Sequence, residues 1–115
     1  MFIQRSHVRK FFFATLFVLI LAVTAKGEDS APEIRFENQH FTPQTLTVPA
    51  GQPLSLKVTN ASADTIEFES FALHREKVIE PGQTITVHLP SLTPGAYDFY
   101  DDFHQEVPEG SIVAQ

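Results

Sequence analysis

The chain has 115 residues, the length of one domain, with eight basic residues, fourteen acidic residues and no cysteine. Its formal net charge of −6 at pH 7 argues against binding to the phosphates of nucleic acids and favours cations or basic partners. The absence of cysteine excludes disulfides, thiolate metal sites and a lipidated-cysteine anchor.

The amino-terminal segment has the three parts of a secretory signal peptide. Three basic residues and no acidic residue precede an apolar run from Phe11 to Val23, which ends in polar sequence after Ala25. This run of thirteen residues is shorter than the roughly 20 that a membrane-spanning helix needs. The sequence therefore predicts a signal peptide over residues 1–25, a periplasmic product and no membrane insertion after processing.

Residues 26–32 (KGEDSAP) are expected to form a flexible leader before one domain over residues 33–115. Removal of residues 1–25 leaves five basic residues against all fourteen acidic ones, a formal net charge of −9. Such a charge attracts cations or basic partners, or it serves only to keep a small secreted domain soluble.

The domain shows the alternation of half-buried strands. Apolar residues recur at every second position in six runs: Ile34 and Phe36; Leu46 and Val48; Leu54, Leu56 and Val58; Ile66 and Phe68; Ile85, Val87 and Leu89; and Tyr97 and Phe99. Pro-Gly pairs at Pro81-Gly82 and Pro94-Gly95 mark turns between them. The pattern predicts an all-β antiparallel sandwich of seven to eight strands.

The segment from Ser70 to Glu80 (SFALHREKVIE) fits neither the strand nor the helix period. We expect it to cross from one sheet to the other, with Lys77 to Ile79 joining an edge strand. The charges at Arg75, Glu76 and Lys77 are interpreted as a solvated cluster.

The segment Gly95 to Gln105 (GAYDFYDDFHQ) carries the clearest candidate site. Alternation from Tyr97 and Phe99 places Asp101 on the core face, where a carboxylate needs a hydrogen bond, a salt bridge or a metal. His104 follows three residues later. Two readings stay open on these residues alone: a shared metal site, or turn-forming aspartates with an exposed histidine.

This segment resembles the ligand loop of the cupredoxins, Gly-x-Tyr-x-Phe-Tyr-Cys-x-Pro-His followed by a turn to a Met. In that resemblance Asp101 stands at the copper-binding Cys, His104 at the His, and Glu109 nearest to the Met. Upstream, the motifs F-T-P, L-T-V-P-A-G and V-T-N resemble the first half of the same fold. The implied fold is a cupredoxin-like Greek-key sandwich.

The motif set as a whole, including E-F-E-S and P-G-x-Y, is most similar to EfeO-type cupredoxin-like domains. Among these it looks closest to the small periplasmic component of bacterial ferrous-iron uptake systems, the FtrB-like proteins. The resemblance places Glu67 at the family's other His. It implies a periplasmic metal-binding protein that assists Fe(II) acquisition, with an inner-membrane iron permease and other periplasmic components as partners.

The expected metal ligands are therefore Glu67, Asp101, His104 and Glu109. Without a thiolate they exclude a type 1 blue-copper site, and their oxygen-rich chemistry suits Cu(II), iron or Mn(II) better than Cu(I). At most the protein would assist ferrous iron oxidation, because no hydrolase or transferase signature is present. Two alternatives remain: a copper carrier or sensor, and a metal-free sandwich that docks a partner.

Three further residues are candidates for the same end of the sandwich: Glu69, His74 and His40. Spacing does not require any of them to join the site, and His40 also fits a polar cap on the first strand. His88, between Val87 and Leu89, is expected to face solvent.

Overall fold

The computed structural model describes residues 31–115, so the predicted signal peptide and most of the predicted leader lie outside the described residues. This part of the chain folds into nine strands: β1 (Glu33–Glu37), β2 (His40–Thr42), β3 (Thr45–Val48), β4 (Leu54–Asn60), β5 (Ile66–Ser70), β6 (Arg75–Ile79), β7 (Thr84–Leu89), β8 (Gly95–Asp101) and β9 (Gly110–Ala114). Residues 31–115 contain no helix long and apolar enough to cross a membrane. The all-β prediction is confirmed.

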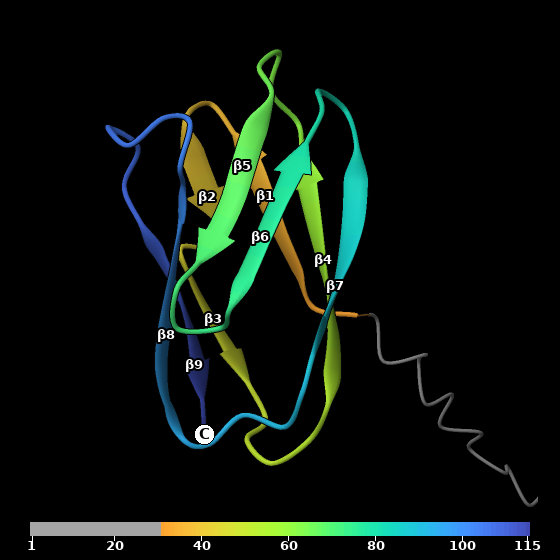
Figure 1. Ribbon diagram of the computed structural model, residues 1–115, viewed down its shortest axis with the longest axis vertical. Coiled ribbons are helices and arrows are strands. Elements are labelled where there is room, and N and C mark those ends of the chain that lie inside the picture. The colour runs from red at the N-terminus through yellow and green to blue at the C-terminus, as the bar shows by residue number, and fades with distance from the viewer. Residues whose placement is uncertain (1–30) are drawn as a thin grey trace, which may run out of the picture.

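The strands form two sheets that face each other (Figure 1). One sheet has the order β2-β1-β4-β7 and the other the order β3-β9-β8-β5-β6. Two neighbouring pairs, β1 with β4 and β3 with β9, run parallel. The predicted sandwich is therefore correct, with nine strands in place of the seven to eight expected and with two parallel pairs among the antiparallel ones. Alternation shows which side of a strand is buried but not which strand lies beside it, and β2 is too short to show alternation.

In the six runs with alternating apolar residues, the buried face is the one that the alternation predicts. Ile34, Phe36, Leu56, Val58 and Phe68 all lie in the core between the sheets. A row of aromatic rings crosses this core: the ring centroids lie 5.0 Å apart for Phe36 and Phe41, 5.0 Å for Phe41 and Phe99, and 5.2 Å for Phe99 and Phe68. Burial of each such side chain stabilises the fold by about 1.5–3 kcal/mol.

The segment from Ser70 to Glu80 does not cross between the sheets, as was expected. It forms the β5–β6 hairpin within the five-stranded sheet, with Glu69 opposite Glu76 and Glu67 opposite Val78. The Ser70 hydroxyl accepts a hydrogen bond from the Leu73 amide at 3.1 Å and closes the turn. The prediction that Lys77 to Ile79 join an edge strand is confirmed, since β6 ends the sheet. The crossing comes later, between β6 and β7.

Candidate metal centre

Asp101 ends β8 with its side chain turned into the core. It is 1% exposed and pairs across the sheet with the buried Phe68. One carboxylate oxygen, Oδ1, accepts hydrogen bonds from the backbone amides of Glu67 at 3.0 Å and Phe103 at 3.1 Å. The inward aim predicted for Asp101 is confirmed, and these amides offset part of the cost of its burial.

His104 lies directly against the second oxygen of Asp101. The distance from His104 Nδ1 to Asp101 Oδ2 is 2.7 Å, within a tight turn in which the His104 amide donates to the Asp101 carbonyl. The hydrogen bond to Asp101 raises the pKa of His104 above its ordinary value, although partial burial of the ring opposes this shift. The sequence prediction that these two side chains meet is correct.

Glu67, by contrast, belongs to the other side of the sheet. Its backbone amide contacts Asp101, but it is next in the chain to Phe68, which faces the core opposite Asp101, so the Glu67 side chain points outward. The residue of this strand end that shares the inward face is Ile66, which is fully buried. The expected ligand set is thus divided between two faces, because the alignment placed Glu67 one residue away from the inward position.

On the outward face Glu67 meets Glu69, which was a further candidate from the sequence, and Glu76, which was not. Carboxylate oxygens of Glu67, Glu69 and Glu76 lie within 4.8 Å of one another, and they are the one such group of three potential ligands among residues 31–115. We call these three residues the acidic triad. Glu76 had been interpreted as part of a solvated charge cluster. Its place becomes predictable only once the hairpin register, Glu69 opposite Glu76, is known.

Within the acidic triad, the environment of Glu67 disfavours the ionised form of its carboxyl group. Glu67 is 5% exposed, and its Oε1 atom is buried with no hydrogen-bond partner among the described residues. The adjoining carboxylate of Glu76, burial, and the negative charges of Asp102 and Glu69 raise the pKa of Glu67 from 4.5 to about 7. Near neutral pH, therefore, Glu67 carries a proton in a substantial fraction of molecules.

Further negative charge borders the triad. Tyr100 pairs with Glu69 across the sheet, and burial together with the charges of Glu69 and Asp102 raises the pKa of its phenol. Tyr100 and Asp102 line a surface hollow together with Glu109. Glu109 thus lies beside residues that border the triad, and its backbone carbonyl accepts a hydrogen bond from Gln44.

The remaining histidine candidates are separated by the fold. His74 lies in the β5–β6 turn and lines a hollow of about 190 Å³ that Glu69 and Glu76 also line. His40 is exposed on the short edge strand β2. His88 is exposed and lies 3.0 Å from the Ser55 hydroxyl, which confirms its predicted outward direction. Of these, only His74 lies near the acidic triad.

The chemistry of the triad is that of a hard-cation site. Three carboxylates offer oxygen ligands only, which suit iron, manganese or calcium better than Cu(I). Two strands of one hairpin position them, so binding requires little ordering of the backbone. One partly protonated carboxylate would release its proton when an ion binds.

Comparison with known proteins identifies the family to which the chain belongs. A family model described as the cupredoxin-like domain matches residues 10–114. The chain belongs to the cupredoxin-like domain family. Uncharacterized protein RP394 of Rickettsia prowazekii is 36% identical over 90 residues, which are 76% of this chain and 72% of that protein.

Solved cupredoxins share the fold at low sequence identity. Auracyanin from Roseiflexus castenholzii matches with a TM-score of 0.64 and 18% identity over 74% of this chain and 96% of its own. The purple cupredoxin of Nitrosopumilus maritimus matches with a TM-score of 0.59 and 16% identity over 73% and 99%. Amicyanin from Paracoccus versutus gives 0.60 and 15% over 76% and 83%. At these identities the likeness establishes the fold alone.

The residues of this cupredoxin-like chain do not fit a type 1 copper ion. Such a centre requires a cysteine thiolate and two histidines, and an amicyanin mutant is among the similar structures in a reduced Cu(I) form. Here the whole chain lacks cysteine, and the inward position at the end of β5 holds Ile66. The position of the resembled thiolate holds a carboxylate that is already hydrogen-bonded to His104.

Proposed function

We propose that this cupredoxin-like protein binds iron through the acidic triad and serves iron acquisition in the periplasm. The observation that carries the proposal is the Glu67 carboxylate: its buried Oε1 atom has no hydrogen-bond partner among the described residues, and one of its oxygens lies within 4.8 Å of oxygens of Glu69 and Glu76. A buried, unpaired carboxylate oxygen is costly in a folded protein. A bound cation would remove that cost.

Iron fits the donor set and the charge of the molecule. Carboxylate oxygens are hard ligands that hold Fe(II) and Fe(III), whereas Cu(I) requires sulfur. The predicted mature chain has a formal net charge of −9, which raises the local concentration of cations. The E-F-E motif that resembles EfeO-type domains contains Glu67 and Glu69, two of the three triad residues.

The proposed cellular setting rests on the predicted signal peptide over residues 1–25 and on the same resemblance. Export into the periplasm would place the triad where an inner-membrane iron permease collects its cargo, and the protein would deliver iron to it or assist Fe(II) oxidation beforehand. Sequencing of the amino terminus of protein from the periplasm tests the first step, with Lys26 expected as the first residue. Retention of Met1 would contradict export by cleavage.

Anaerobic titration with Fe(II), followed by calorimetry, tests the site. The wild type is compared with Glu67→Gln and Glu76→Gln, which keep the side-chain size but remove one charge each. The control is Glu37→Gln, since Glu37 pairs with Arg35 on the other sheet. We expect both triad variants to lose at least tenfold in affinity and the control to bind as the wild type does.

Two results would overturn the proposal. If no protein binds Fe(II) tighter than about millimolar, the reading as a metal-free docking module takes its place. If Cu(II) alone binds at the triad, the reading as a copper carrier or sensor is favoured instead. Mn(II), which has similar ligand preferences and no redox chemistry under these conditions, separates binding from oxidation.

A further inference from the structure

A phenol borders the acidic triad on its β8 side. On the outward face of the sheet, Glu69 is the middle residue of a cross-strand row: Glu76 of β6 pairs with it on one side and Tyr100 of β8 on the other. The Cβ atoms of directly paired residues lie about 4.5–5.5 Å apart. Tyr100 is therefore as close a neighbour of Glu69 as Glu76 is, although only Glu76 belongs to the triad.

A second row of the same face runs through Glu67. Val78 of β6 pairs with Glu67 on one side. On the other side, the Asp102 amide donates a hydrogen bond to the Glu67 carbonyl at 3.0 Å, which continues the pairing of β5 with β8 by one residue. The charge of Asp102 contributes to the raised pKa of both Glu67 and Tyr100, because it lies near both groups. Tyr100 and Asp102 thus close the β8 side of the triad.

No basic side chain belongs to either of these two rows. The basic residues of β6, Arg75 and Lys77, pair with Ser70 and Phe68 and therefore alternate toward the other face of the sheet. Four carboxyl groups and one phenol consequently face one another without an ammonium or guanidinium group between them. An ion bound here would meet only oxygen donors, and a highly charged ion would gain most from them.

The phenol of Tyr100 can become a metal ligand only by losing its proton. In the metal-free protein, burial and the charges of Glu69 and Asp102 hold the pKa of Tyr100 above its ordinary value, so the phenol keeps its proton. A trivalent cation at the triad would compensate those charges and stabilise the phenolate. The lower charge of Fe(II) compensates less, so the phenol would stay protonated beside it.

We propose that Tyr100 is the ligand by which the acidic triad distinguishes Fe(III) from Fe(II). When Fe(III) binds, the phenol releases its proton to solvent and its oxygen joins the three carboxylates of the triad as a fourth ligand. The iron enters as Fe(III), so this step transfers no electron. A phenolate is a hard, anionic donor and increases the preference of the site for the harder ion. The inference rests on the proposed function and adds to it the oxidation state that the site retains.

The test uses Fe(III), supplied as its nitrilotriacetate complex, and chelator-treated protein purified from the periplasm. Binding by the wild type should produce the broad visible absorption band of phenolate-to-Fe(III) charge transfer, which carboxylates alone do not give. Tyr100→Phe removes only the hydroxyl group, so it should lose this band and weaken Fe(III) binding roughly tenfold or more. Its anaerobic Fe(II) binding should remain that of the wild type.

The one other tyrosine of the chain provides a matched control. Tyr97 lies three residues before Tyr100 in β8, so its side chain leaves the opposite face of the strand. Its hydroxyl is engaged by Thr93, whose carbonyl accepts a hydrogen bond from it at 2.8 Å. Tyr97→Phe should therefore keep both the visible band and the Fe(III) affinity of the wild type.

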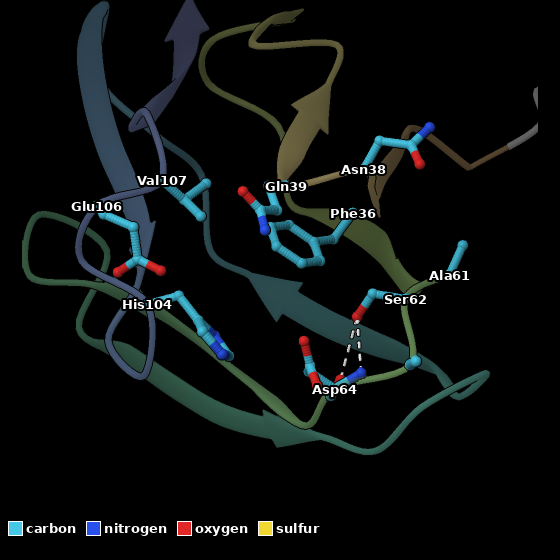
Figure 2. A pocket seen from close by; sticks show the side chains of 10 residues that line it. Phe36, Asn38, Gln39, Ala61, Ser62, Asp64, His104, Glu106 and Val107 are labelled. Carbon is cyan, nitrogen blue, oxygen red and sulfur yellow. Dashed lines mark hydrogen bonds between the residues drawn. The ribbon is translucent and has the colours of Figure 1, made fainter.

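Iron bound at another place would be recognised by its lack of this band. The β1–β2 turn, the β4–β5 loop and the β8–β9 loop enclose a pocket of about 270 Å³, whose ionisable groups are Asp64, His104 and Glu106 (Figure 2). No tyrosine lines this pocket, and the acidic triad contributes no residue to it. Iron held there would give no phenolate band and would not respond to Tyr100→Phe.

Three results would overturn the inference and leave the triad proposal intact. These are Fe(III) binding by the wild type without the band, a band that persists in Tyr100→Phe, and an equal loss of the band in Tyr97→Phe. Glu67→Gln reports on the triad itself and should weaken the binding of Fe(II) and Fe(III) alike. If the wild type binds iron in neither oxidation state tighter than about millimolar, the proposed function and the inference fail together.

Discussion

The backbone amide of Glu67 donates a hydrogen bond to Asp101 Oδ1 at 3.0 Å, while the two carboxylates themselves leave opposite faces of the five-stranded sheet. This bond ties the last residue of β8 to the second residue of β5. Through it, the strand that presents Glu67 to the acidic triad is held by the same carboxylate that orients His104. Asp101 therefore supports both the strand that carries the acidic triad and the orientation of the His104 ring.

The stability of the metal-free protein should fall as pH rises from about 5 to 8. The pKa of Glu67 is near 7 in the folded protein and 4.5 in the unfolded chain, so the folded state binds more protons between these values. The raised pKa of His104 acts in the same direction. The protonated ring stabilises the folded protein fully below pH 6.5, and this stabilisation is lost as the pH rises above the pKa of the folded state. Melting temperatures measured across this range, with chelator present, test the slope.

Glu67→Gln separates the two contributions. A neutral amide cannot titrate, so the decrease in stability from pH 5 to 8 should become smaller, and at pH 8 the variant should be more stable than the metal-free wild type. Saturating Fe(II) under anaerobic conditions should stabilise the wild type at pH 8 but not the variant. Identical dependence of stability on pH in the two proteins would show that the pKa of Glu67 is not raised in the folded state.

The hydrogen bond between Asp101 and His104 predicts the result of two substitutions at Asp101. Asp101→Asn keeps an acceptor for the amides of Glu67 and Phe103 but removes the charge, so the pKa of His104 should fall from its raised value to the ordinary value of a histidine or below it. Titration of the ring resonances by nuclear magnetic resonance measures this. Asp101→Leu leaves both amides without an acceptor and should destabilise the fold by about 1–3 kcal/mol for each. An unchanged histidine titration in Asp101→Asn would contradict the assigned pairing.

The buried face of the alternating strands could be predicted from the sequence, and the neighbours of each strand could not. Alternation correctly placed Phe99 and Asp101 inward and His88 outward, because this period is local. The β5–β6 hairpin was missed because its turn depends on the Ser70 side chain and on His74 with a φ of 54°, which no Gly or Pro signals. Because that turn was not recognised, the sequence pattern did not indicate that Glu76 lies beside Glu67 and Glu69.

The aromatic row gives a direct check of the strand register. Phe99 is fully buried between Phe41 and Phe68, so Phe99→Ala should cost about 3–5 kcal/mol of unfolding free energy. His88→Ala should cost little, since the side chain is exposed. Gly110→Ala provides an independent test, because an added methyl group would overlap the Phe99 ring. Denaturant unfolding of the three variants should rank both core changes well below His88→Ala in stability.

Glu67 and Asp101 lie on opposite faces of the sheet. This predicts which substitutions would create a copper centre with strong visible absorption. A blue-copper centre requires one cysteine and two histidines around a single point. Ile66 is buried on the same face as Asp101, whereas Glu67 lies on the opposite face, so the inward partner for a thiolate at position 101 is position 66. The double variant Asp101→Cys with Ile66→His, with His104 retained, should therefore give an intense visible thiolate-to-Cu(II) absorption band.

The matched control places the new histidine at position 67 instead of position 66. Asp101→Cys with Glu67→His carries the same number of cysteines and histidines, but its new histidine points away from the thiolate, so it should bind Cu(II) without the intense band of a trigonal centre. Both variants are compared by absorbance after one equivalent of Cu(II) is added to protein of verified fold by circular dichroism. Equal bands from the two variants, or a band from the Glu67→His variant alone, would mean that position 67 rather than 66 faces Asp101. The sequence alignment that placed Glu67 at the second histidine would then be correct, and the placement of Glu67 on the opposite face from Asp101 and His104 would fail.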